Sequence, residues 1–252
     1  MAKLKRIVKF LDEYLNIDEI EDNSWNGLQI EGNPVVEKAL FAVDAGMETF
    51  TTAVGENADL IVVHHGHFWK NLNPSVTEWA KERIEILYEH KISLYACHLP
   101  LDKHREIGNN AQLLRLLGAR IKEEFGEYQG TCIGWIGEFK PPLSVKMIEK
   151  KLNSQLKAEC TVLPFGKKRV KTIATCSGGG GLRIFFEALN KRVDLYLTGD
   201  STEIYHTAKD AHFNVIFAGH HATETLGVKT LCEIVRQKTK IETLFVDIPT
   251  EL

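Results

Sequence analysis

Hydrophobic and polar residues follow two different periods along this chain, and these periods predict strands and helices in turn. Residues 60–63, Leu-Ile-Val-Val, form an unbroken aliphatic run, which is typical of a strand buried on both faces of a sheet. Residues 3–15 instead repeat apolar side chains every three or four positions, which predicts an amphipathic helix. The chain therefore combines helices with buried strands.

From residue 38 onward the predicted strands and helices alternate. In the first half the strands cover 39–43, 60–64 and 92–97, and the helices cover 46–56, 76–89 and 109–117. In the second half the strands cover 170–175, 193–197, 214–218 and 244–246, and the helices cover 181–191, 202–211 and 223–237. This alternation predicts an α/β fold with a mostly parallel sheet and right-handed crossovers.

The two halves of this alternation have similar spacing. Strands are predicted to start near 39 and 60 in the first half and near 172 and 194 in the second, about 21 residues apart in both. We therefore predict duplicated βαβαβα units that form mostly parallel sheet or sheets. We expect the two units to contribute comparable loops to one crevice.

The stretch between the halves has a different character. Residues 131–139 alternate as a strand does, and Pro141-Pro142 is expected to break that strand. Ser144 is expected to cap a helix, and another strand is predicted at 158–163. This predicts a small inserted α+β domain with an interaction or lid role. The predicted domains are 1–120 together with 170–252, and the insertion at 121–169.

The composition is that of an ordinary globular protein. A formal net charge of −3 over 252 residues, with a pI near 6.4, gives no global attraction to nucleic acid or anionic membranes. The five cysteines include no C-x-x-C pair, which favours a reducing compartment and inert thiols. No apolar signal region or membrane-length apolar run is present in the sequence, so we expect a cytoplasmic protein without a membrane span.

Histidines and acidic residues gather at the predicted ends of three strands. The clusters are His64-His65-Gly66-His67, His98-Leu-Pro-Leu-Asp102 and Gly219-His220-His221-Ala-Thr-Glu224. Parallel strands end at the same edge of a sheet, and α/β sheets bind their ligands at that edge. We therefore expect the three clusters to converge on one site. His220 and Glu224 are four residues apart at a helix start, so they share one face.

The ligand types in these clusters indicate a metal site. Imidazoles and carboxylates without thiols suit divalent Zn, Mn, Fe, Co or Ni, and they do not suit a cysteine-rich structural zinc site. Five or six such ligands exceed what one tetrahedral ion needs, whereas two ions bridged by a carboxylate and a water would use them all. One histidine pair alone is more often a capped surface turn, but three pairs at equivalent strand ends favour metal binding.

Several separated motifs are similar to those of the Nif-three-like family and occur in the same order. They are Trp25-Asn-Gly-Leu-Gln29, His64-His65-Gly-His67-Phe-Trp-Lys70, His98-Leu-Pro-Leu-Asp102, Asn109-Asn110-Ala-Gln-Leu, Gly219-His-His-Ala-Thr-Glu224 and Asp247-Ile-Pro249. The similarity covers almost the whole chain, and several separated motifs make it specific. Bacterial and archaeal members of this family carry the name GTP cyclohydrolase I type 2 homologues.

The resemblance implies a two-lobed α/β subunit with a dinuclear centre of two divalent ions. It also implies a ring-shaped homohexamer, a toroid whose sites face an inner cavity. Matched motif by motif, the metal ligands would be His64, His65, Asp102, His220 and Glu224. His98 lies in the same motif as Asp102, and the resemblance implies that it is either a further metal ligand or a residue that contacts a ligand. Asp200 is a departure, because similar sequences often carry the longer glutamate there.

The residues beside these ligands have less direct expected roles. His221 points about 100° away from His220 on a helix, so we expect it to bind substrate or to support a ligand. His67 is expected either to line the pocket or to be exposed. Lys70 is expected either to bind a phosphate group of the substrate or to be a solvated surface lysine.

A glycine run at 178–181 follows a predicted strand and precedes a predicted helix. It does not match G-x-G-x-x-G, because the residues from Leu182 onward supply no glycine at the third glycine position of that motif. A tight strand–helix turn beside the metals is the simpler interpretation. The alternative is that Gly178, Gly179 and Gly180 bind a nucleotide phosphate through free N–H groups.

These observations favour a metal-dependent hydrolase that acts on a nucleotide or related phosphorylated heterocycle through a metal-activated water. His98 or His221 would shuttle protons. The resemblance implies opening of the GTP imidazole ring. The alternative is a non-catalytic hexameric ring that binds metal together with protein or nucleic-acid partners. A third interpretation is a metal that only holds the two halves together.

Overall fold

The computed structural model describes residues 1–250 and divides the chain into two compact units. Unit 1 comprises Met1–Leu101 and Val228–Ile248. Unit 2 comprises Asp102–Gly227 together with residues 249–250. Each unit has its own sheet, and each is described here by itself.

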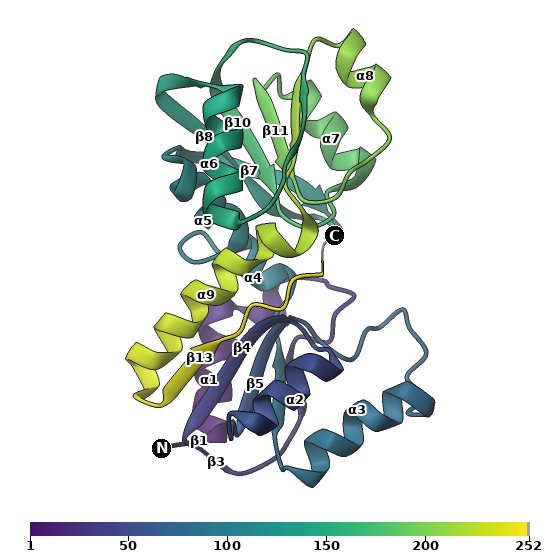
Figure 1. Ribbon diagram of the computed structural model, residues 1–252, viewed down its shortest axis with the longest axis vertical. Coiled ribbons are helices and arrows are strands. Elements are labelled where there is room, and N and C mark those ends of the chain that lie inside the picture. The colour runs from purple at the N-terminus through teal and green to yellow at the C-terminus, as the bar shows by residue number, and fades with distance from the viewer. Residues whose placement is uncertain (251–252) are drawn as a thin grey trace. The chain divides into compact units, whose positions relative to one another are not determined.

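Unit 1 is built on a five-stranded sheet in the order β13-β4-β5-β6-β2 (Figure 1). Its strands are β2 (Gly27–Ile30), β4 (Lys38–Asp44), β5 (Leu60–His65), β6 (Ser93–Ala96) and β13 (Glu242–Phe245). β13, β4, β5 and β6 run parallel, and β2 pairs antiparallel with β6 at one edge. The short strands β1 (Ala2–Lys3) and β3 (Val35–Val36) pair separately.

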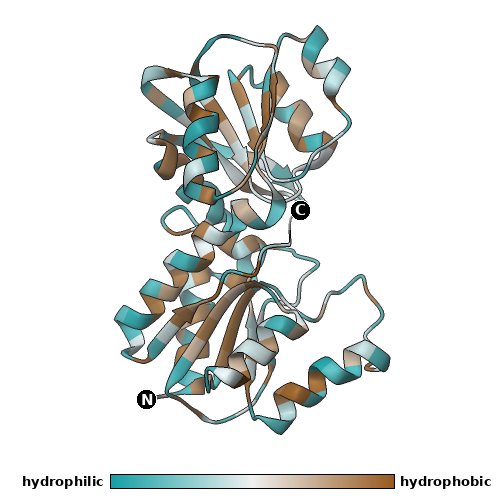
Figure 2. Cartoon of the chain, in the orientation of Figure 1, coloured by the Kyte–Doolittle hydropathy of each residue, from teal (hydrophilic) through white to brown (hydrophobic). Residues whose placement is uncertain are grey.

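Helices cover both faces of this sheet, with α2 in front of it and α1 behind it in Figure 1. The helical segments that lie wholly in unit 1 are α1 (Leu4–Leu15), η1 (Ile17–Glu19), α2 (Met47–Gly55) and α3 (Glu78–Glu89). On the α2–α3 face, Phe50 and Leu87 pack with strand residues such as Leu40, Ile61 and Leu94. Figure 2 shows the apolar strands between helices with polar outer faces, as expected for a sheet buried on both sides.

Unit 2 contains a six-stranded mixed sheet in the order β7-β8-β10-β11-β12-β9. Its strands are β7 (Arg120–Tyr128), β8 (Thr131–Ser144), β9 (Thr161–Pro164), β10 (Arg169–Cys176), β11 (Leu195–Thr198) and β12 (Asn214–Phe217). The central strands β10, β11 and β12 are parallel, and the other pairings are antiparallel.

The helices of unit 2 also pack on its sheet. They are α5 (Asn109–Leu117), α6 (Val145–Leu156), α7 (Gly181–Asn190) and α8 (Tyr205–Asp210). One core cluster joins Leu114 of α5 and Ile148 of α6 to Ile173, Leu195 and Ile216 of the central strands. Two further helices have residues in both units: α4 (Leu99–Lys103) and α9 (His220–Thr239).

Each unit contains the predicted strand–helix alternation. Unit 1 has β4-α2-β5-α3-β6 and unit 2 has β10-α7-β11-α8-β12, each with three parallel strands. The predicted α/β fold is therefore confirmed, with sheets that are mixed at their edges. α5 matches its predicted range of 109–117, whereas α9 begins at His220, three residues before its predicted start at 223.

The stretch 121–169 is predicted to be a separate inserted domain, but in the structure its strands are part of the sheet of unit 2. β8 and β9 lie within it, β7 begins one residue before it, and all three belong to the sheet of unit 2. β8 does not break at Pro141-Pro142 but continues to Ser144. The pairing of β8 with β10 shifts register between Val170 and Thr172, so the prolines fall where the ladder is already interrupted.

Asp194 in unit 2 gives a testable dependence of stability on pH. Burial alone would raise its pKa, but hydrogen bonds from Lys167 and from the N–H groups of Lys171 and Thr172 outweigh burial, so the pKa is lowered. A lowered carboxyl pKa stabilises the fold above the unfolded pKa of about 3.9, and this stabilisation is lost as the pH falls through the folded pKa.

Asp194→Asn is expected to lower the free energy of unfolding by about 1–3 kcal/mol at pH 7, because the part-buried N–H groups of Lys171 and Thr172 lose a charged acceptor. Urea unfolding from pH 7 down to pH 3 measures this difference, which should shrink below pH 4. A difference that stays constant over this range would contradict the assignment. Asp210→Asn, at the exposed end of α8, is the control.

None of the helices in the described part of the chain combines the length and the apolar character needed to cross a bilayer.

Candidate metal centre

Three neighbouring parallel strands of unit 1 carry polar side chains at their carboxyl ends. β4 ends at Asp44, and β5 ends at His64 and His65. His98 follows β6 by two residues. Because these strands are adjacent and parallel, the four side chains emerge at one edge of the sheet, as the sequence predicts for the histidines.

The imidazole rings of His64, His65 and His98 form a compact cluster, which we call the imidazole set. The ring centroids of His64 and His65 are 4.7 Å apart, those of His64 and His98 are 5.0 Å apart, and those of His65 and His98 are 5.5 Å apart. Each ring offers one nitrogen, and these three atoms lie within 4.8 Å of one another. Three nitrogens at this separation could hold one metal ion.

Each ring of the imidazole set is held through its Nδ1 atom. His64 Nδ1 lies 2.9 Å from the carbonyl oxygen of Cys97. His65 Nδ1 lies 2.8 Å from Asp44 Oδ1, and His98 Nδ1 lies 2.9 Å from Asp22 Oδ1. An acceptor at Nδ1 favours the tautomer that carries the proton there and presents the Nε2 lone pair to an ion. The donor chemistry therefore fits a divalent ion.

Asp22 contacts the imidazole set, and the sequence reasoning missed it. Its carboxylate is 2% exposed and also accepts hydrogen bonds from the N–H of Leu99 and from the Asn26 amide. Burial alone would raise its pKa, but the hydrogen bond and charge of His98 lower the pKa to about 2. Asp22 lies in a turn-rich loop where aspartate is common, so its residue type gave no signal.

Asp44 was also missed, although a signal was present. It directly follows the predicted strand 39–43, at the same sheet edge as the histidines. The strand-end rule that selected the histidines therefore also applied to Asp44.

Asp22→Asn is expected to weaken divalent-ion binding to the imidazole set by about 10–100-fold, because residues that orient a ligand contribute on that scale. An asparagine can turn its NH₂ toward Nδ1, which favours the other histidine tautomer. Competition with a fluorescent zinc chelator measures the affinity. Asp18→Asn, an exposed acid of η1, is the control and should leave the affinity unchanged. Equal affinities in all three proteins would contradict the role of Asp22.

Unit 2 contains a second set of ligand types, made of Asp102, His220 and Glu224, which we call the carboxylate set. His220 and Glu224 lie one turn apart in α9, with 3.3 Å between His220 Nε2 and Glu224 Oε1. Carboxylate oxygens of Asp102 and Glu224 lie within 4.8 Å of each other. Asp102 also accepts hydrogen bonds from Ser177 Oγ and the Asn109 amide, which orient it.

His220 is also held through Nδ1, which lies 2.9 Å from Asp200 Oδ1. The aspartate at position 200 therefore reaches the ring, although the resemblance led us to expect a longer glutamate. Burial alone would lower the pKa of His220, but Glu224 and Asp200 raise it to about 9. Carboxylates that favour a proton on this ring would also favour a cation beside it.

The glycine run packs directly against the carboxylate set. A Cβ on Gly178 would lie 2.2 Å from Glu224 Oε1, and one on Gly179 would lie 2.8 Å from Asp200 Oδ2. The N–H of Gly178 already donates to Thr223 Oγ1, and that of Gly180 donates to Thr198 Oγ1. Close approach explains the glycines as a tight turn, and phosphate binding by Gly178, Gly179 and Gly180 stays a prediction.

The remaining predicted residues lie outside both sets. His67 is half-buried and packs edge-on against Phe68 and Trp79. His221 is buried at the start of α9. Lys70 is exposed, and its Nζ lies 5.4 Å from the centroid of the Trp25 ring. The prediction that all three sequence clusters share one centre involves both units, and it stays a prediction.

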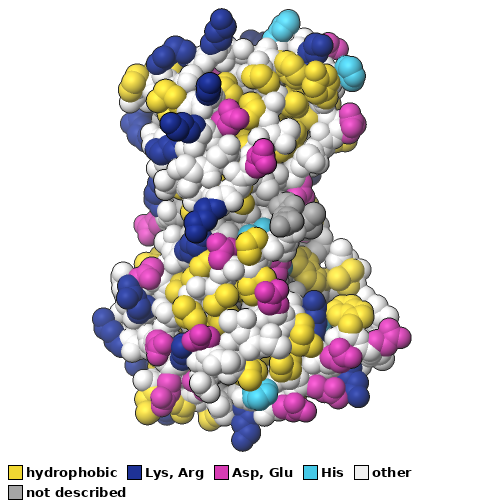
Figure 3. Space-filling model, in the orientation of Figure 1, with side chains coloured by type: hydrophobic (Ala, Val, Ile, Leu, Met, Phe, Trp, Pro, Cys, Tyr) yellow, Lys and Arg dark blue, Asp and Glu magenta, His cyan; other side chains and the backbone are white. Residues whose placement is uncertain are grey.

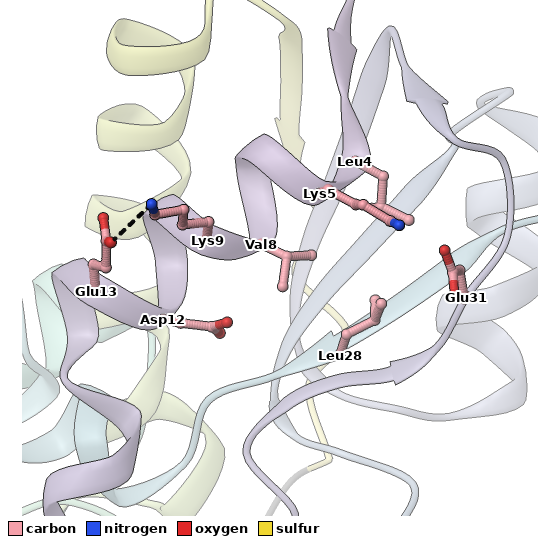
Figure 4. A pocket seen from close by; sticks show the side chains of 8 residues that line it. All are labelled: Leu4, Lys5, Val8, Lys9, Asp12, Glu13, Leu28 and Glu31. Atoms are coloured by element: carbon pink, nitrogen blue, oxygen red, sulfur yellow. Dashed lines mark ion pairs between the residues drawn. The ribbon is translucent and has the colours of Figure 1, made fainter.

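Two cavities lie away from these sets. A cavity of about 330 Å³ in unit 1 lies beside α1 and β2, with Asp12 facing Leu28 across it (Figure 4). A cavity of about 380 Å³ in unit 2 is lined by the start of α6 and by Lys167 and Lys168. Neither is lined by a residue of the imidazole or carboxylate set.

The fold and these sets define a class: an α/β protein whose strand ends carry histidine, aspartate and glutamate groups that could hold a metal ion. A family model described as Duf34/NIF3 (NGG1p interacting factor 3) matches residues 2–251. The chain therefore belongs to the Duf34/NIF3 family.

Curated relatives and solved structures agree with this assignment. Proteins named "GTP cyclohydrolase 1 type 2 homolog" are 46% identical over 250 residues in Archaeoglobus fulgidus and 47% identical over 248 residues in Pyrococcus horikoshii. These alignments cover 99% and 98% of both chains, respectively. A structure described as protein ybgI, of unknown function, has a TM-score of 0.93 at 33% identity and full coverage of both chains. TTHA1606 from Thermus thermophilus has a TM-score of 0.88 at 35% identity, again with full coverage.

Proposed function

We propose that this protein is a divalent-metal-dependent hydrolase that acts on a nucleotide or a related phosphorylated heterocycle. The imidazole set of unit 1 would hold one ion, and the carboxylate set of unit 2 would hold another. This assigns His64, His65, Asp102, His220 and Glu224 as ligands, and it adds His98. The names of the relatives from Archaeoglobus and Pyrococcus support GTP as the first substrate to test.

One observation carries the proposal: each ring of the imidazole set is fixed through Nδ1 by an oxygen acceptor. Histidines that serve only in packing need no such common arrangement. A divalent ion at such sites supplies Lewis-acid activation of water and of an attacked group. The chain's own contribution is to orient the rings through Asp44, Asp22 and the Cys97 carbonyl.

Proton transfer is assigned to His221. His98 shares the imidazole set with two other candidate ligands, and its Nδ1 is bonded to Asp22. On the sequence alone, His98 and His221 are equal candidates for the proton shuttle. The geometry favours His98 as a ligand and leaves the shuttle role to His221, which is buried beside His220.

The test is turnover of a nucleotide panel by protein stripped with chelator and reloaded with Zn, Mn, Fe, Co or Ni. We expect hydrolysis of at least one purine nucleotide, with GTP first, by protein that carries two ions per chain. His65→Ala should abolish this turnover, and His90→Ala, an exposed histidine that follows α3, should retain it. Protein loaded with two ions that turns over no nucleotide in the panel would contradict the proposal.

A ring-shaped homohexamer in the cytoplasm remains part of the proposal and rests on family membership. Light scattering after size-exclusion chromatography measures the assembly directly. A mass of one or two chains at micromolar concentration would contradict it.

A specific observation favours a second candidate function, which is binding to nucleic acid. Arg120, Lys122, Lys140 and Lys171 surround the single carboxylate of Glu138, at N–O distances of 3.3–3.9 Å. Figure 3 shows Lys and Arg side chains over the part of unit 2 that carries β8 and α6. This local excess of positive charge can bind phosphates although the whole chain is acidic.

Binding of labelled single-stranded DNA and RNA at several salt concentrations tests the second candidate. The affinity should fall steeply with salt. In the double variant Lys140→Met/Lys171→Met, the slope of log affinity against log salt concentration should become shallower by the amount expected for the loss of about two phosphate contacts. Affinity that does not change with salt, or with these substitutions, would exclude this surface.

A further inference from the structure

Two loops form a rim beside the imidazole set. The N–H of Trp25 donates to the carbonyl of Phe68 over 3.2 Å, and the N–H of Lys70 donates to the carbonyl of Asn23 over 2.7 Å. These bonds pair loop residues 23–25 with residues 68–70 in antiparallel fashion. The two loops are therefore joined to each other within unit 1.

Gln29 fixes this rim through its side-chain amide. Its Oε1 accepts from the N–H groups of His67 and Phe68, and its Nε2 donates to the carbonyl of Trp25. A Cβ on Gly66 would lie 2.4 Å from Gln29 Nε2, so glycine lets the amide lie against this backbone. The rim is thus positioned by hydrogen bonds to the Gln29 amide, not by its exposed side chains.

The rim also contacts the imidazole set. Asn26 Oδ1 accepts from the N–H of His98 over 2.8 Å. The Trp69 ring centroid lies 5.1 Å from that of His98 and 6.1 Å from that of His65. Trp25 precedes Asn26 and Lys70 follows Trp69 in the chain, so the backbone of both residues lies next to the residues that contact the imidazole set.

Trp25 is not explained by packing. Its side chain is 55% exposed, although the surrounding backbone is held by hydrogen bonds. A fixed, exposed indole presents a large apolar face that can stack on a flat ring. Lys70 Nζ lies over this ring, 5.4 Å from its centroid, so a cation and an aromatic surface stand together at the rim.

We propose that Trp25 and Lys70 recognise the substrate, with Trp25 stacking on a planar heterocyclic base and Lys70 binding an anionic phosphate. This inference rests on the proposed function, because it names the residues that would select a nucleotide at that site. An aromatic face and an ammonium group from one rim match the two chemical parts of a nucleotide. The indole accepts any base, and the lysine requires a phosphate.

The test compares three probes on the metal-loaded protein by equilibrium dialysis: GMP, guanosine and ribose 5-phosphate. Trp25→Ala should weaken GMP and guanosine binding by roughly 10- to 100-fold and leave ribose 5-phosphate unchanged. Lys70→Met should weaken GMP and ribose 5-phosphate binding and leave guanosine unchanged. Trp25→Phe should restore most of the affinity, because phenylalanine keeps an aromatic face.

Matched controls use exposed residues of the same unit. Tyr88→Ala removes an aromatic ring that is 68% exposed on α3, and Lys81→Met removes an exposed lysine of the same helix. Neither should change the affinity for any probe. GMP affinity that is unchanged in Trp25→Ala would overturn the inference. If GMP affinity is unchanged and light scattering shows a changed assembly in Trp25→Ala, Trp25 lies at a contact with another copy, and the inference is again overturned.

The outcomes also separate this inference from the proposed hydrolase function. Probe-dependent losses in Trp25→Ala and Lys70→Met, without turnover of any nucleotide, would support the recognition residues and contradict the hydrolase. Turnover with an unchanged KM in Trp25→Ala would overturn the recognition residues and leave the hydrolase intact.

Discussion

Replacing His64 by alanine is expected to weaken divalent-ion binding in unit 1 by more than about 100-fold, because loss of an orienting partner alone costs about 10–100-fold. His64 is fully buried, and its ring lies close to the rings of both His65 and His98. Its removal leaves two nitrogens, which is too few to hold an ion in competition with water and buffer. Elemental analysis after gel filtration should show the loss of one ion per chain.

The control for this substitution is His67→Ala, which removes a histidine three positions away that lies outside the imidazole set. It should keep the full ion content. Because His64 is buried, its replacement also lowers the stability of the fold. The ion content is therefore normalised to the amount of folded protein, which circular dichroism measures. Full ion content in folded His64→Ala would remove His64 from the ligands.

Gly178→Ala is expected to lower the free energy of unfolding by about 2–5 kcal/mol and to disturb the carboxylate set. Gly178 has a φ of +58°, which costs a residue with a Cβ about 1–2 kcal/mol. The added methyl group would also lie 2.2 Å from Glu224 Oε1 and 3.0 Å from His220 Nε2, and overpacking costs about 1–3 kcal/mol. Urea unfolding measures the first effect, and ion content measures the second.

Gly181→Ala separates these two causes. Gly181 has nearly the same φ, +60°, but no heavy atom lies within 4 Å of a Cβ placed there. It should lose only the backbone contribution of about 1–2 kcal/mol and should retain its ions. Equal losses in the two variants would show that close approach to Glu224 contributes nothing.

The sequence predicted the arrangement of the parallel strands because their signal is local. The aliphatic run at 60–63 and the two later strands of unit 2 lie within buried sheets, and apolar composition alone marks them. The imidazole set followed from one general rule, since His64, His65 and His98 lie beyond adjacent parallel strands.

The features that the sequence did not reveal depend on partners far away in the chain. β7 was missed because its burial pattern alternates poorly, and its pairing with β8 organises it. β8 passes through two prolines because a register shift in β10 removes the need for their N–H groups. Asp22 and His98 are 76 residues apart, so no local pattern links them.

The domain boundaries also depend on contacts between residues that are far apart in the sequence. The sequence predicts a single helix at 223–237, and α9 is indeed one helix, yet its first residues belong to unit 2 and its later residues to unit 1. A division into units follows from long-range contacts, which residue composition and spacing do not reveal.

The Nδ1 hydrogen bonds have a consequence for how the protein would acquire its metal. Asp22, Asp44 and the Cys97 carbonyl set the orientation of three rings as part of the fold, so an ion bound to the imidazole set would not have to organise its own ligands. The entropy of ordering these side chains is therefore lost during folding and not during metal uptake. One ion could replace another without refolding, and the metal found in cells would then reflect supply and the Irving–Williams order.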